Sequence, residues 1–488
     1  MRRFVLLVCS IVAPVTFVGA AVAGCGSDDG STFGSSGGGG SSGSSGCTGF
    51  GCVDGDAGSK PGCQGLECNQ PACTGASKTT LTGRVFDPAG KVPLYNVVVY
   101  VPNGEPAPIA AGLGPTCDRC DGSVSGDPIA LTATDANGNF TLVDIPADTD
   151  FPLVMQIGKW RRKVTIPKVA ACQSAAADPT LTRLPRNRNE GDIPRIALTT
   201  GSADPLECLL RKIGLDDSEF GTAGSEARVH LYTGSSTAPA SATSSFSSGG
   251  AFGQATALWG SLDELKKYDI VMLSCEGGEH EDTKPEAARQ ALYDYAKVGG
   301  RVFTSHYHHY WFSNSPVAEV KGIASWTNDY TCQGGGCSFT AEPAADASVN
   351  ATVDTSFAKG AAMKEWLKNT QSLTGPGETL PILEARHNID SVNPGALSWM
   401  TIQNPAAGNK IAHEYVSFNT PVGAPDDQVC GRVVYSDLHV GAGDTTGAPF
   451  PTGCTTPDLT PQQKALEFML FDLSSCIQKD DLPPVLPK

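Results

Sequence analysis

Histidine and carboxylate side chains follow three apolar runs in the second half of this chain. The first run is followed by Cys275, Glu276, Glu279 and His280, the second by His306, His308 and His309, and the third by Asp437 and His439. The metal-ligand candidates among them are Glu276, His306, His308, Asp437 and His439. If these runs are parallel strands of one sheet, their carboxyl ends meet at the edge where such sheets bind ligands. Imidazole and carboxylate groups together suit a divalent transition metal, and they can also transfer protons in catalysis. The sequence therefore offers a candidate metal site, with His306 and Glu276 as its catalytic candidates.

A second interpretation needs no metal and no other cofactor. The same side chains can line a polar cleft in which each histidine is hydrogen-bonded and inert. No P-loop, no Gly-x-Gly-x-x-Gly motif after a strand and no His-Glu-x-x-His motif is present to support a particular chemistry. From the sequence we favour this second interpretation, so we expect no cofactor unless a divalent transition metal occupies the site.

The elements that would position these residues alternate between strand and helix from residue 190 to residue 478. Short apolar runs indicate strands, and longer amphipathic runs closed by glycine indicate helices. This alternation predicts a parallel sheet covered on both faces, in a doubly wound, flavodoxin-like α/β domain. The expected strands are 196–199, 229–232, 268–274 and 302–305, and the expected helices are 206–213, 262–267 and 285–297.

Three features of this region resemble a known family. They are the run Tyr268-Asp269-Ile270-Val271-Met272-Leu273-Ser274, the run from Ala291 to Phe303 that contains Gly299-Gly300-Arg301, and His306. The chain is similar here to the class I glutamine amidotransferase-like fold, most closely to its trehalose-utilisation branch. The resemblance implies that residues 431–439 form the final strand of the sheet and that residues 466–473 form its closing helix.

One position departs from the chemistry of that family. Active members hold a cysteine nucleophile on a glycine-flanked turn after the strand that matches 302–305, but this chain has Thr304-Ser305-His306-Tyr307 there. Cys275 ends an earlier strand, so the resemblance gives it no nucleophile role. We therefore expect no glutaminase activity.

Residues 79–175 contain short β-branched runs separated by Gly, Asn and Pro, which predicts an antiparallel β-sandwich. Three motifs resemble the carboxypeptidase regulatory-like domain: Thr82-Gly83-Arg84-Val85, Pro93-Leu94-x-Asn96-Val97 and Thr134-Asp135-x-Asn137-Gly138-x-Phe140. The resemblance implies a transthyretin-like, carbohydrate-binding-like fold that serves as a spacer or docking module.

A basic run at residues 159–163 borders one expected strand of this sandwich and contains Trp160. Lys and Arg on an exposed edge strand discourage pairing with another sheet, and this is the interpretation that we favour. The alternative is a binding surface for an acidic or sugar polymer, on which Trp160 would be the glycan contact.

The amino terminus predicts export and a lipid anchor. Residues 1–24 contain two arginines, a short apolar segment and small residues, as in a secretory signal peptide. Ala23-Gly24-Cys25 resembles the lipobox of bacterial lipoproteins, which implies acylation of Cys25, for example by palmitate, and location in the outer membrane. Residues 25–46 then form a linker rich in Gly and Ser, which behaves as flexible coil.

Cysteine usage agrees with export. The chain has 17 cysteines, and removing Cys9 with the signal peptide and Cys25 with the lipid leaves an odd number, so one thiol should be free or bonded to another chain. Disulfides rather than zinc are expected in the Cys-rich segment 47–78, because its spacings are irregular and it contains no histidine. Other expected pairs are Cys332 with Cys337, Cys430 with Cys454, and Cys117 and Cys120 with Cys172 and one further cysteine.

The net charge of −16 argues against nucleic acid as a partner, because the chain has no basic footprint. The leading hypothesis is a non-catalytic envelope lipoprotein, anchored in the membrane, whose β-sandwich spacer carries a degenerate amidotransferase-like domain and a short tail at 479–488. That domain would bind a glycan or an envelope protein. The alternative is a metal-assisted hydrolase or another carbohydrate-acting enzyme that uses the His306 region.

Overall fold

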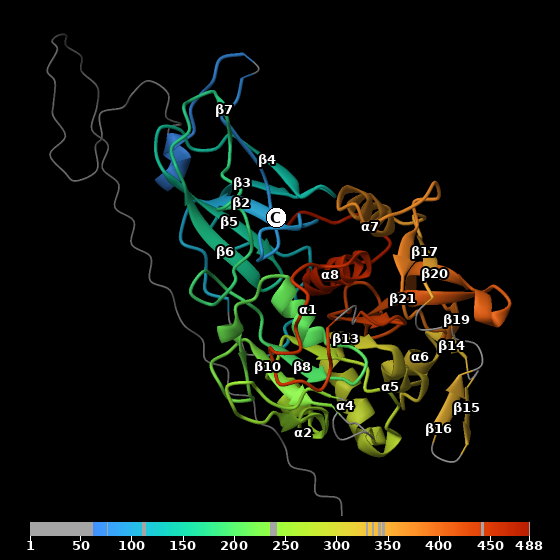
Figure 1. The fold of residues 1–488 in the computed structure, drawn as a ribbon. Helices are drawn as coiled ribbons and strands as arrows, with labels where there is room; N and C mark the ends of the chain where they lie inside the picture. The colour runs from blue at the N-terminus through green and yellow to red at the C-terminus, as the bar shows by residue number, and fades with distance from the viewer. Residues whose placement is uncertain are drawn as a thin grey trace, which may run out of the picture. The chain divides into compact units, whose positions relative to one another are not determined.

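The computed structural model describes most of the chain from residue 62 to residue 487 (Figure 1). The residues from Asp56 to Lys488 belong to one compact unit. The predicted signal peptide, the predicted lipidation site Cys25, the linker and the first two cysteines of the Cys-rich segment lie outside the described residues. No described helix is both long enough and apolar enough to cross a membrane. The described ranges are 62–75, 77–109, 114–234, 242–327, 330–333, 336–339, 343, 347–440 and 444–487.

Two β-sheets follow a short 3₁₀ turn, η1 (Gly65–Asn69), and form the first part of the described chain. Their strands are β1 (Thr80–Arg84), β2 (Val98–Pro102), β3 (Pro128–Ala133), β4 (Asn139–Val143), β5 (Phe151–Ile157), β6 (Trp160–Ile166) and β7 (Ser174–Ala176). One sheet has the order β4-β1-β7 and the other the order β3-β2-β5-β6. Burial alternates along β4, where Phe140 and Leu142 face the core between exposed neighbours, as in a strand with one buried face.

The prediction of a purely antiparallel sandwich is wrong at one strand. Strand β7 pairs with β1 in parallel, with Leu81 opposite Ala175. The reason is the chain path, because β5 and β6 lie in the other sheet and the chain returns to β1 only after them.

The largest sheet contains five parallel strands that follow one another in space as β10-β8-β12-β13-β22. Numbered along the chain, this order is 2-1-3-4-5, which is the order of flavodoxin-like, doubly wound sheets. Two short strands pair with β10 at the edge. The strands are β8 (Ile196–Thr200), β9 (Phe220–Gly221), β10 (Val229–Thr233), β11 (Gly253–Gln254), β12 (Ile270–Leu273), β13 (Arg301–Ser305) and β22 (Gly431–Ser436).

Helices cover both faces of this parallel sheet, as predicted. Along β12, Ile270 and Met272 pack into one apolar core while Val271 and Leu273 pack into another. Side chains of α1 (Leu206–Lys212) and α8 (Pro461–Ser474) share the first core, and those of α2 (Ala255–Trp259), α3 (Leu262–Leu265) and α4 (Glu286–Lys297) share the second. Helix α8 begins with a capping box in which Thr460 and Gln463 satisfy each other's backbone N–H groups.

The sequence did not predict the structure of the chain between β13 and β22. Here β21 (Lys410–Thr420) pairs antiparallel with β22 and extends the sheet through β20 (Leu397–Asn404), β17 (Val349–Val353) and β18 (Leu380–Ile382). The remaining elements are η2 (Asp217–Glu219), η3 (Glu281–Thr283), η4 (His306–His309), α5 (Tyr310–Ser313), α6 (Ala318–Lys321), β14 (Ala324–Trp326), β15 (Tyr330–Gln333), β16 (Gly336–Phe339), α7 (Ala358–Asn369), β19 (Ile389–Val392) and η5 (Pro405–Ala407).

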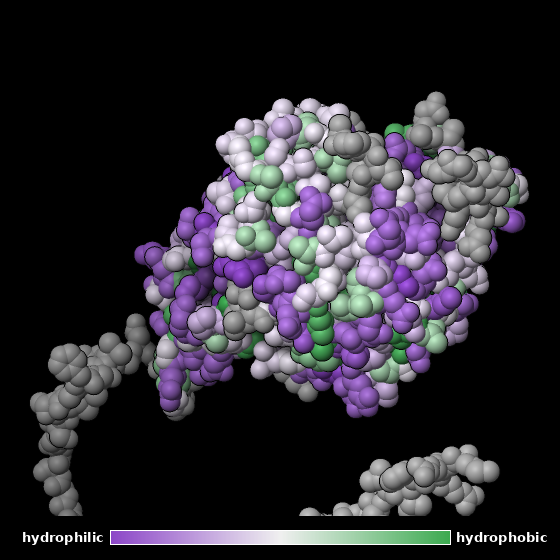
Figure 2. Space-filling model, turned by 90° about the horizontal axis from the view of Figure 1, so that it is seen from below, coloured by the Kyte–Doolittle hydropathy of each residue, from purple (hydrophilic) through white to green (hydrophobic). Residues whose placement is uncertain are grey.

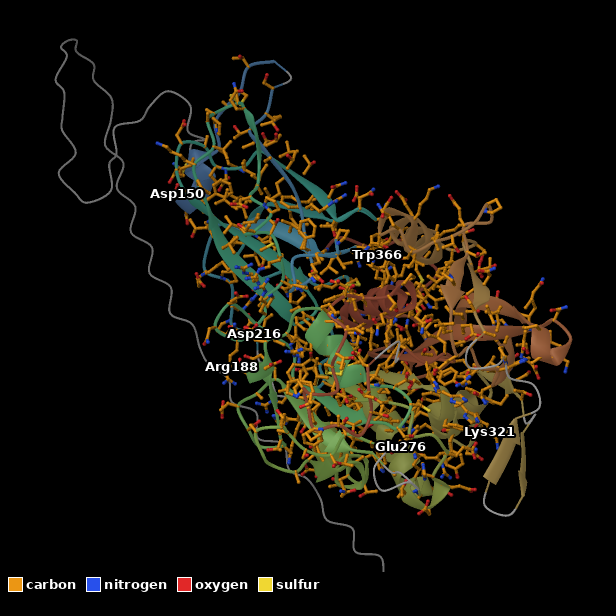
Figure 3. All side chains as sticks on the ribbon, in the orientation of Figure 1. Asp150, Arg188, Asp216, Glu276, Lys321 and Trp366 are labelled. Atoms are coloured by element: carbon orange, nitrogen blue, oxygen red, sulfur yellow. A yellow bond between two sulfur atoms is a disulfide. The ribbon has the colours of Figure 1, made fainter. Side chains whose placement is uncertain are left out.

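The sandwich packs directly on the α/β part and is not a free spacer. Trp160 is fully buried and its ring meets Phe471 of α8 edge-on, with the centroids 5.7 Å apart. Tyr95 stacks on Phe468 of the same helix. The indole N–H of Trp366 in α7, labelled in Figure 3, donates to the carbonyl of Pro93. The proposed glycan contact at Trp160 is therefore wrong, because the core of the protein already covers this ring.

Disulfides strengthen this junction in a pattern that differs from the predicted one. Cys117 pairs with Cys430 and Cys120 with Cys476, so two bonds join the sandwich to the α/β part. Two further bonds lie in the amino-terminal part and one in the α/β part: Cys63–Cys68, Cys73–Cys172 and Cys208–Cys454. The predicted pairs Cys430–Cys454 and Cys117 or Cys120 with Cys172 are wrong, because chain spacing does not report which loops meet in space. Cys332 and Cys337 lie opposite each other in the β15–β16 hairpin, and their bond stays a prediction.

The described surface is polar, and the large apolar side chains exposed on it are scattered. The face in Figure 2 shows mostly hydrophilic residues with small hydrophobic patches between them. This surface agrees with the strongly acidic composition of the chain.

Candidate metal centre

The carboxyl ends of three neighbouring strands meet at one edge of the sheet. Strand β12 is followed by Cys275, β13 by His306 and β22 by His439, and the strands are adjacent in the order β12-β13-β22. Their register is tight, since Leu273 lies opposite Thr304 and Ser305 opposite Ser436. The predicted meeting of strand ends is therefore present.

Three potential ligand atoms converge at this edge. Cys275 Sγ lies 3.5 Å from His306 Nδ1, which lies 3.0 Å from His439 Nε2. All three residues are buried, and their ligand atoms lie within 4.8 Å of one another. Among the described residues this is the one such group of three. Two of the five predicted metal residues thus meet, and their third partner is Cys275, which the sequence analysis did not assign to the site.

The spacing of the donor atoms fits a small tetrahedral metal ion. With the usual metal–ligand bond lengths for zinc, two nitrogens lie about 3.3 Å apart and a nitrogen and a sulfur about 3.6 Å apart. The observed 3.0 Å and 3.5 Å are close to these values. One thiolate and two imidazoles are donors that suit zinc or copper rather than magnesium or calcium, and three protein ligands leave a fourth position open.

A hydrogen-bond chain fixes the Cys275 backbone. Its N–H donates to Ser305 Oγ (2.9 Å), and the Ser305 hydroxyl donates to Asp204 Oδ2 (2.8 Å). The other oxygen of Asp204 accepts the N–H of Val440 (2.7 Å). The loop after β8 therefore ties the ends of β12, β13 and β22 together. Cys275 itself is the one free cysteine among those whose side chains the structure describes, in agreement with the odd cysteine count.

The second ring nitrogen of His439 is held by a carboxylate. Nδ1 lies 2.9 Å from Glu384 Oε2, and Arg386 Nη2 lies 3.1 Å from the same nitrogen. When Nδ1 donates to a carboxylate, Nε2 is free to bind a metal, and metal-binding histidines almost always have such a partner. Burial alone would lower the pKa of His439, but the charges of Asp204 and Cys275 and the bond to Glu384 outweigh it and raise the pKa to about 10.

His306 is neutral and conformationally unusual. Burial, reinforced by His439 and Arg386, lowers its pKa well below the usual range. A neutral imidazole is the form that binds metals. Its φ of +41° lies in the left-handed region, which is uncommon for residues other than glycine.

The other three predicted metal residues have different partners. Glu276 (labelled in Figure 3) forms a fully buried ion pair with Lys284 Nζ at 2.5 Å. His308 Nε2 lies 2.8 Å from the carbonyl of Ser274, and its Nδ1 accepts the indole N–H of Trp311. Asp437 accepts the backbone N–H of Asn388 and contacts the Tyr435 hydroxyl. Each of these groups is fully engaged away from the convergence point, so the structure does not bring them together with His306 and His439.

A further histidine lies on the same turn as His306. His309 ends η4, the 3₁₀ turn that begins at His306, and is buried like His306. His309 Nε2 lies 3.2 Å from Glu279 Oε1, on the loop after β12. A histidine oriented by a carboxylate is the usual arrangement for proton transfer.

Sequence reasoning missed three residues of this centre: Cys275, Glu384 and Arg386. The signal for Cys275 was present, because an unpaired thiol was expected and this cysteine directly follows an apolar strand. Glu384 and Arg386 belong to the region between β13 and β22, whose fold was not predicted, so nothing placed them beside His439.

Comparisons with known proteins add likenesses of low score. No protein-family model and no curated protein matches the chain. A solved putative ThuA-like protein from Bacteroides uniformis is 12% identical with a TM-score of 0.30, over 59% of this chain and 95% of that one. A cytoplasmic protein from Salmonella typhimurium is 11% identical with a TM-score of 0.28, over 59% of this chain and 100% of that one. BcpA, the major pilin subunit of Bacillus cereus, is 12% identical with a TM-score of 0.14, over 22% and 30% respectively. The strand order of the sheet, rather than these likenesses, defines the fold.

Proposed function

We propose that the α/β part of this chain is a metal-assisted hydrolase whose centre is Cys275, His306 and His439. The observation that carries this proposal is the convergence of three buried donor atoms at tetrahedral spacing, with His439 oriented by Glu384. A metal ion with an open fourth position lowers the pKa of a bound water and polarises a substrate oxygen. The role of the chain is to hold that ion at the end of a rigid sheet.

His309 and Glu279 are the proton-transfer pair in this proposal. Glu279 accepts from Nε2 of His309, which leaves Nδ1 as the nitrogen that takes up or delivers a proton. His309 belongs to the same short turn, η4, as the proposed ligand His306. Neither His309 nor Glu279 is a ligand, which keeps proton transfer separate from metal binding.

The substrate class that we propose is a glycan of the cell envelope. Aromatic side chains border the centre: the ring of Tyr307 lies 4.0 Å from that of His306, and Trp326 lies 6.0 Å from His309. Such rings offer flat apolar surfaces beside polar groups, the usual lining of sites for small organic ligands. The five described disulfides are typical of a chain that folds outside the cytoplasm.

The same setting supports the finer assignments made from the sequence. We propose a lipid on Cys25 that tethers the chain to the outer membrane, a carboxypeptidase regulatory-like module at 79–175 and an amidotransferase-like domain of the trehalose-utilisation type at 190–478. The two-sheet arrangement and the 2-1-3-4-5 strand order support the last two.

Metal analysis of the purified full-length chain tests the centre. The parent should carry about one equivalent of zinc or another transition metal, and His306→Ala should lose it. His413→Ala is the matched control, since His413 lies on β21 and contacts Ser398 instead. A parent that retains no metal after exposure to zinc would return the domain to the class of glycan- or protein-binding modules.

Membrane fractionation tests the tether. Cys25→Ser should move the protein from the membrane pellet to the soluble fraction, because acyl chains contribute about 0.8 kcal/mol per buried CH₂ to membrane binding. A variant that stays in the pellet after a salt wash would contradict the lipid anchor.

A further inference from the structure

The strained conformation of His306 needs a support, and the structure contains one. The Tyr435 hydroxyl on β22 lies 3.0 Å from the backbone carbonyl of His306 and 2.8 Å from Asp437 Oδ1. All three residues are buried. The Tyr435 hydroxyl, with one proton to share between these two acceptors, therefore contacts the backbone of His306 from the neighbouring strand, beside the point where β13 ends.

The same hydroxyl is linked to the loop that orients His439. The other carboxylate oxygen of Asp437 accepts the N–H of Asn388 (2.6 Å), and the Asp437 carbonyl accepts the N–H of Arg386 (2.9 Å). Arg386 and the nearby Glu384 are the residues that contact His439 Nδ1. One buried pair, Tyr435 and Asp437, thus contacts the backbone of one ligand and the loop that orients the other.

We propose that Tyr435 and Asp437 are positioning residues that preset the distance between His306 and His439, and that metal affinity depends on them although neither is a ligand. This inference rests on the proposed metal centre. It reassigns Asp437, which the sequence suggested as a ligand, to a role that acts through Tyr435. Left-handed backbone is costly at a residue with a side chain, and the contact with Tyr435 supports it at His306.

Removal of the Tyr435 hydroxyl should therefore lower metal affinity without lowering the stability of the fold to the same extent. Removing the hydroxyl leaves the Tyr435 ring in the apolar core that it shares with Phe312 and Trp326, so the fold should survive. The His306 carbonyl would lose its partner, and the ring of His306 would no longer be held facing His439. Loss of a group that orients a metal ligand usually weakens binding tenfold to a hundredfold.

Zinc binding by the full-length protein tests this proposal. Zinc affinity, measured by competition with a chromophoric chelator, should fall at least about tenfold in Tyr435→Phe. The control is Tyr415→Phe. Tyr415 is another buried tyrosine, on the adjacent strand β21, and is not one of the two proposed positioning residues. Cobalt-loaded protein should show altered visible absorption bands in Tyr435→Phe and unaltered bands in the control.

Thermal midpoints of the metal-free variants separate positioning from damage to the fold. If Tyr435→Phe folds poorly, Asp437→Asn serves as the second variant. It should also lose zinc affinity, by a smaller factor than Tyr435→Phe. Equal zinc affinity and equal cobalt spectra in the parent and in both variants would overturn the positioning role while leaving the metal centre intact. A parent that binds no zinc would overturn the metal centre itself and the positioning role with it.

Discussion

Strands β13 and β22 carry a buried polar cluster at each of their two ends, and the clusters differ in how their charges are matched. At the amino ends, Arg301 lies opposite Arg432. At the carboxyl ends, His306 and His439 meet Cys275. Both clusters are fully buried, so the contrast between them is one of chemistry rather than of exposure.

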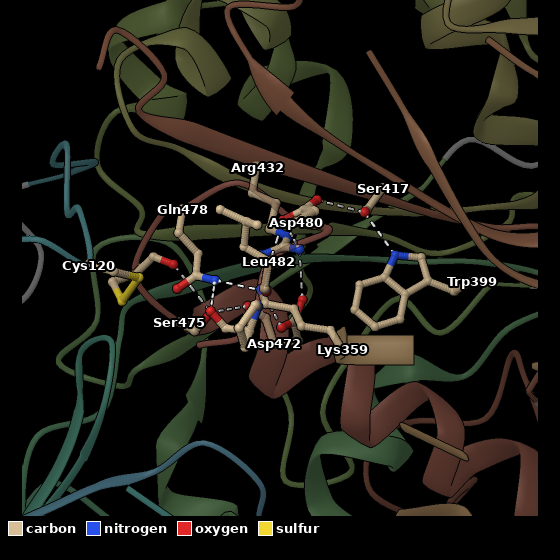
Figure 4. Close-up of polar contacts among 12 residues, drawn as sticks. Cys120, Lys359, Trp399, Ser417, Arg432, Asp472, Ser475, Gln478, Asp480 and Leu482 are labelled. Carbon is tan, nitrogen blue, oxygen red and sulfur yellow. Dashed lines mark hydrogen bonds and ion pairs between the residues drawn. A yellow bond between two sulfur atoms is a disulfide. The ribbon is translucent and has the colours of Figure 1, made fainter. Parts of the chain in front are cut away.

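The amino-end cluster is complete within the protein (Figure 4). Arg432 pairs with Asp472 at 2.9 Å and also with Asp480, and Lys359 pairs with Asp472 at 2.9 Å. Two cations thus meet two carboxylates. Arg301 donates to two backbone carbonyls beside them. Such a cluster needs no ligand, because Arg432 and Lys359 contact carboxylates and Arg301 is hydrogen-bonded to backbone carbonyls.

The carboxyl-end cluster instead points three donor atoms at one place and includes a strained backbone. Its groups would be matched by a cation that the chain does not supply. Both clusters bury charged groups, so burial of charge alone does not mark a functional site in this protein. Ligand-type donor atoms that converge at the carboxyl edge of the sheet do.

The largest effect is expected when the amino-end cluster is disrupted. Arg432→Met should lower the free energy of unfolding by about 3–5 kcal/mol, because it leaves buried carboxylates without a partner. Denaturant unfolding measures this loss, and zinc affinity should not change. Arg84→Met, at an exposed position, is the control and should cost less than about 0.5 kcal/mol. An unchanged free energy of unfolding in Arg432→Met would show that the ion pairs at the amino ends of β13 and β22 do not stabilise the fold.

The next largest effect is expected when a ligand is removed from the carboxyl-end cluster. Cys275→Ser should weaken zinc binding at least about a hundredfold, or about 2.7 kcal/mol, because a serine hydroxyl is a poor substitute for a thiolate ligand. Competition with a chelator measures this loss. The thermal midpoint of the metal-free variant should stay close to that of the parent. Full zinc affinity in the variant would rule out Cys275 as a ligand.

The pH dependence of the two clusters should also differ. Zinc binding would displace the proton of His439, whose pKa is raised to about 10, so affinity should rise at least about tenfold per pH unit between about pH 6 and pH 8. For Asp472, burial acts to raise the pKa, but Arg432 and Lys359 outweigh it and lower the pKa. A carboxylate with a depressed folded pKa adds stability above its unfolded value and loses it as pH falls through the folded pKa. Its contribution should therefore be constant over the same pH range, and zinc titrations paired with unfolding curves compare the two.

The smallest expected effect concerns the orientation of His439. Glu384→Gln keeps a hydrogen-bond acceptor near Nδ1 but removes the negative charge, and zinc affinity should fall about tenfold. Glu378→Gln is the matched control, since Glu378 is an exposed carboxylate paired with Lys368. Equal affinity in the two variants would show that the Glu384 charge does not tune the centre.

The sequence by itself determined the elements of the parallel sheet and the edge at which a site would lie. Alternating apolar runs and helices carry that information locally, since each strand must be apolar to be buried on both faces. The histidines at 306 and 439 could be placed because strand ends in such a sheet meet by topology. The odd number of cysteines also predicted that one thiol would be free or bonded to another chain.

Only the tertiary structure decided which polar residues share the centre. Glu276 and Asp437 have the right chemistry and sit at the right strand ends, yet Lys284 and Tyr435 hold them elsewhere. Glu384 reaches His439 from a segment whose path depends on the antiparallel strands between β13 and β22. The burial of Trp160 and the disulfides to Cys430 and Cys476 depend likewise on how the sandwich packs against α8. Local patterns do not encode these outcomes, because they depend on contacts between residues that lie far apart in the chain.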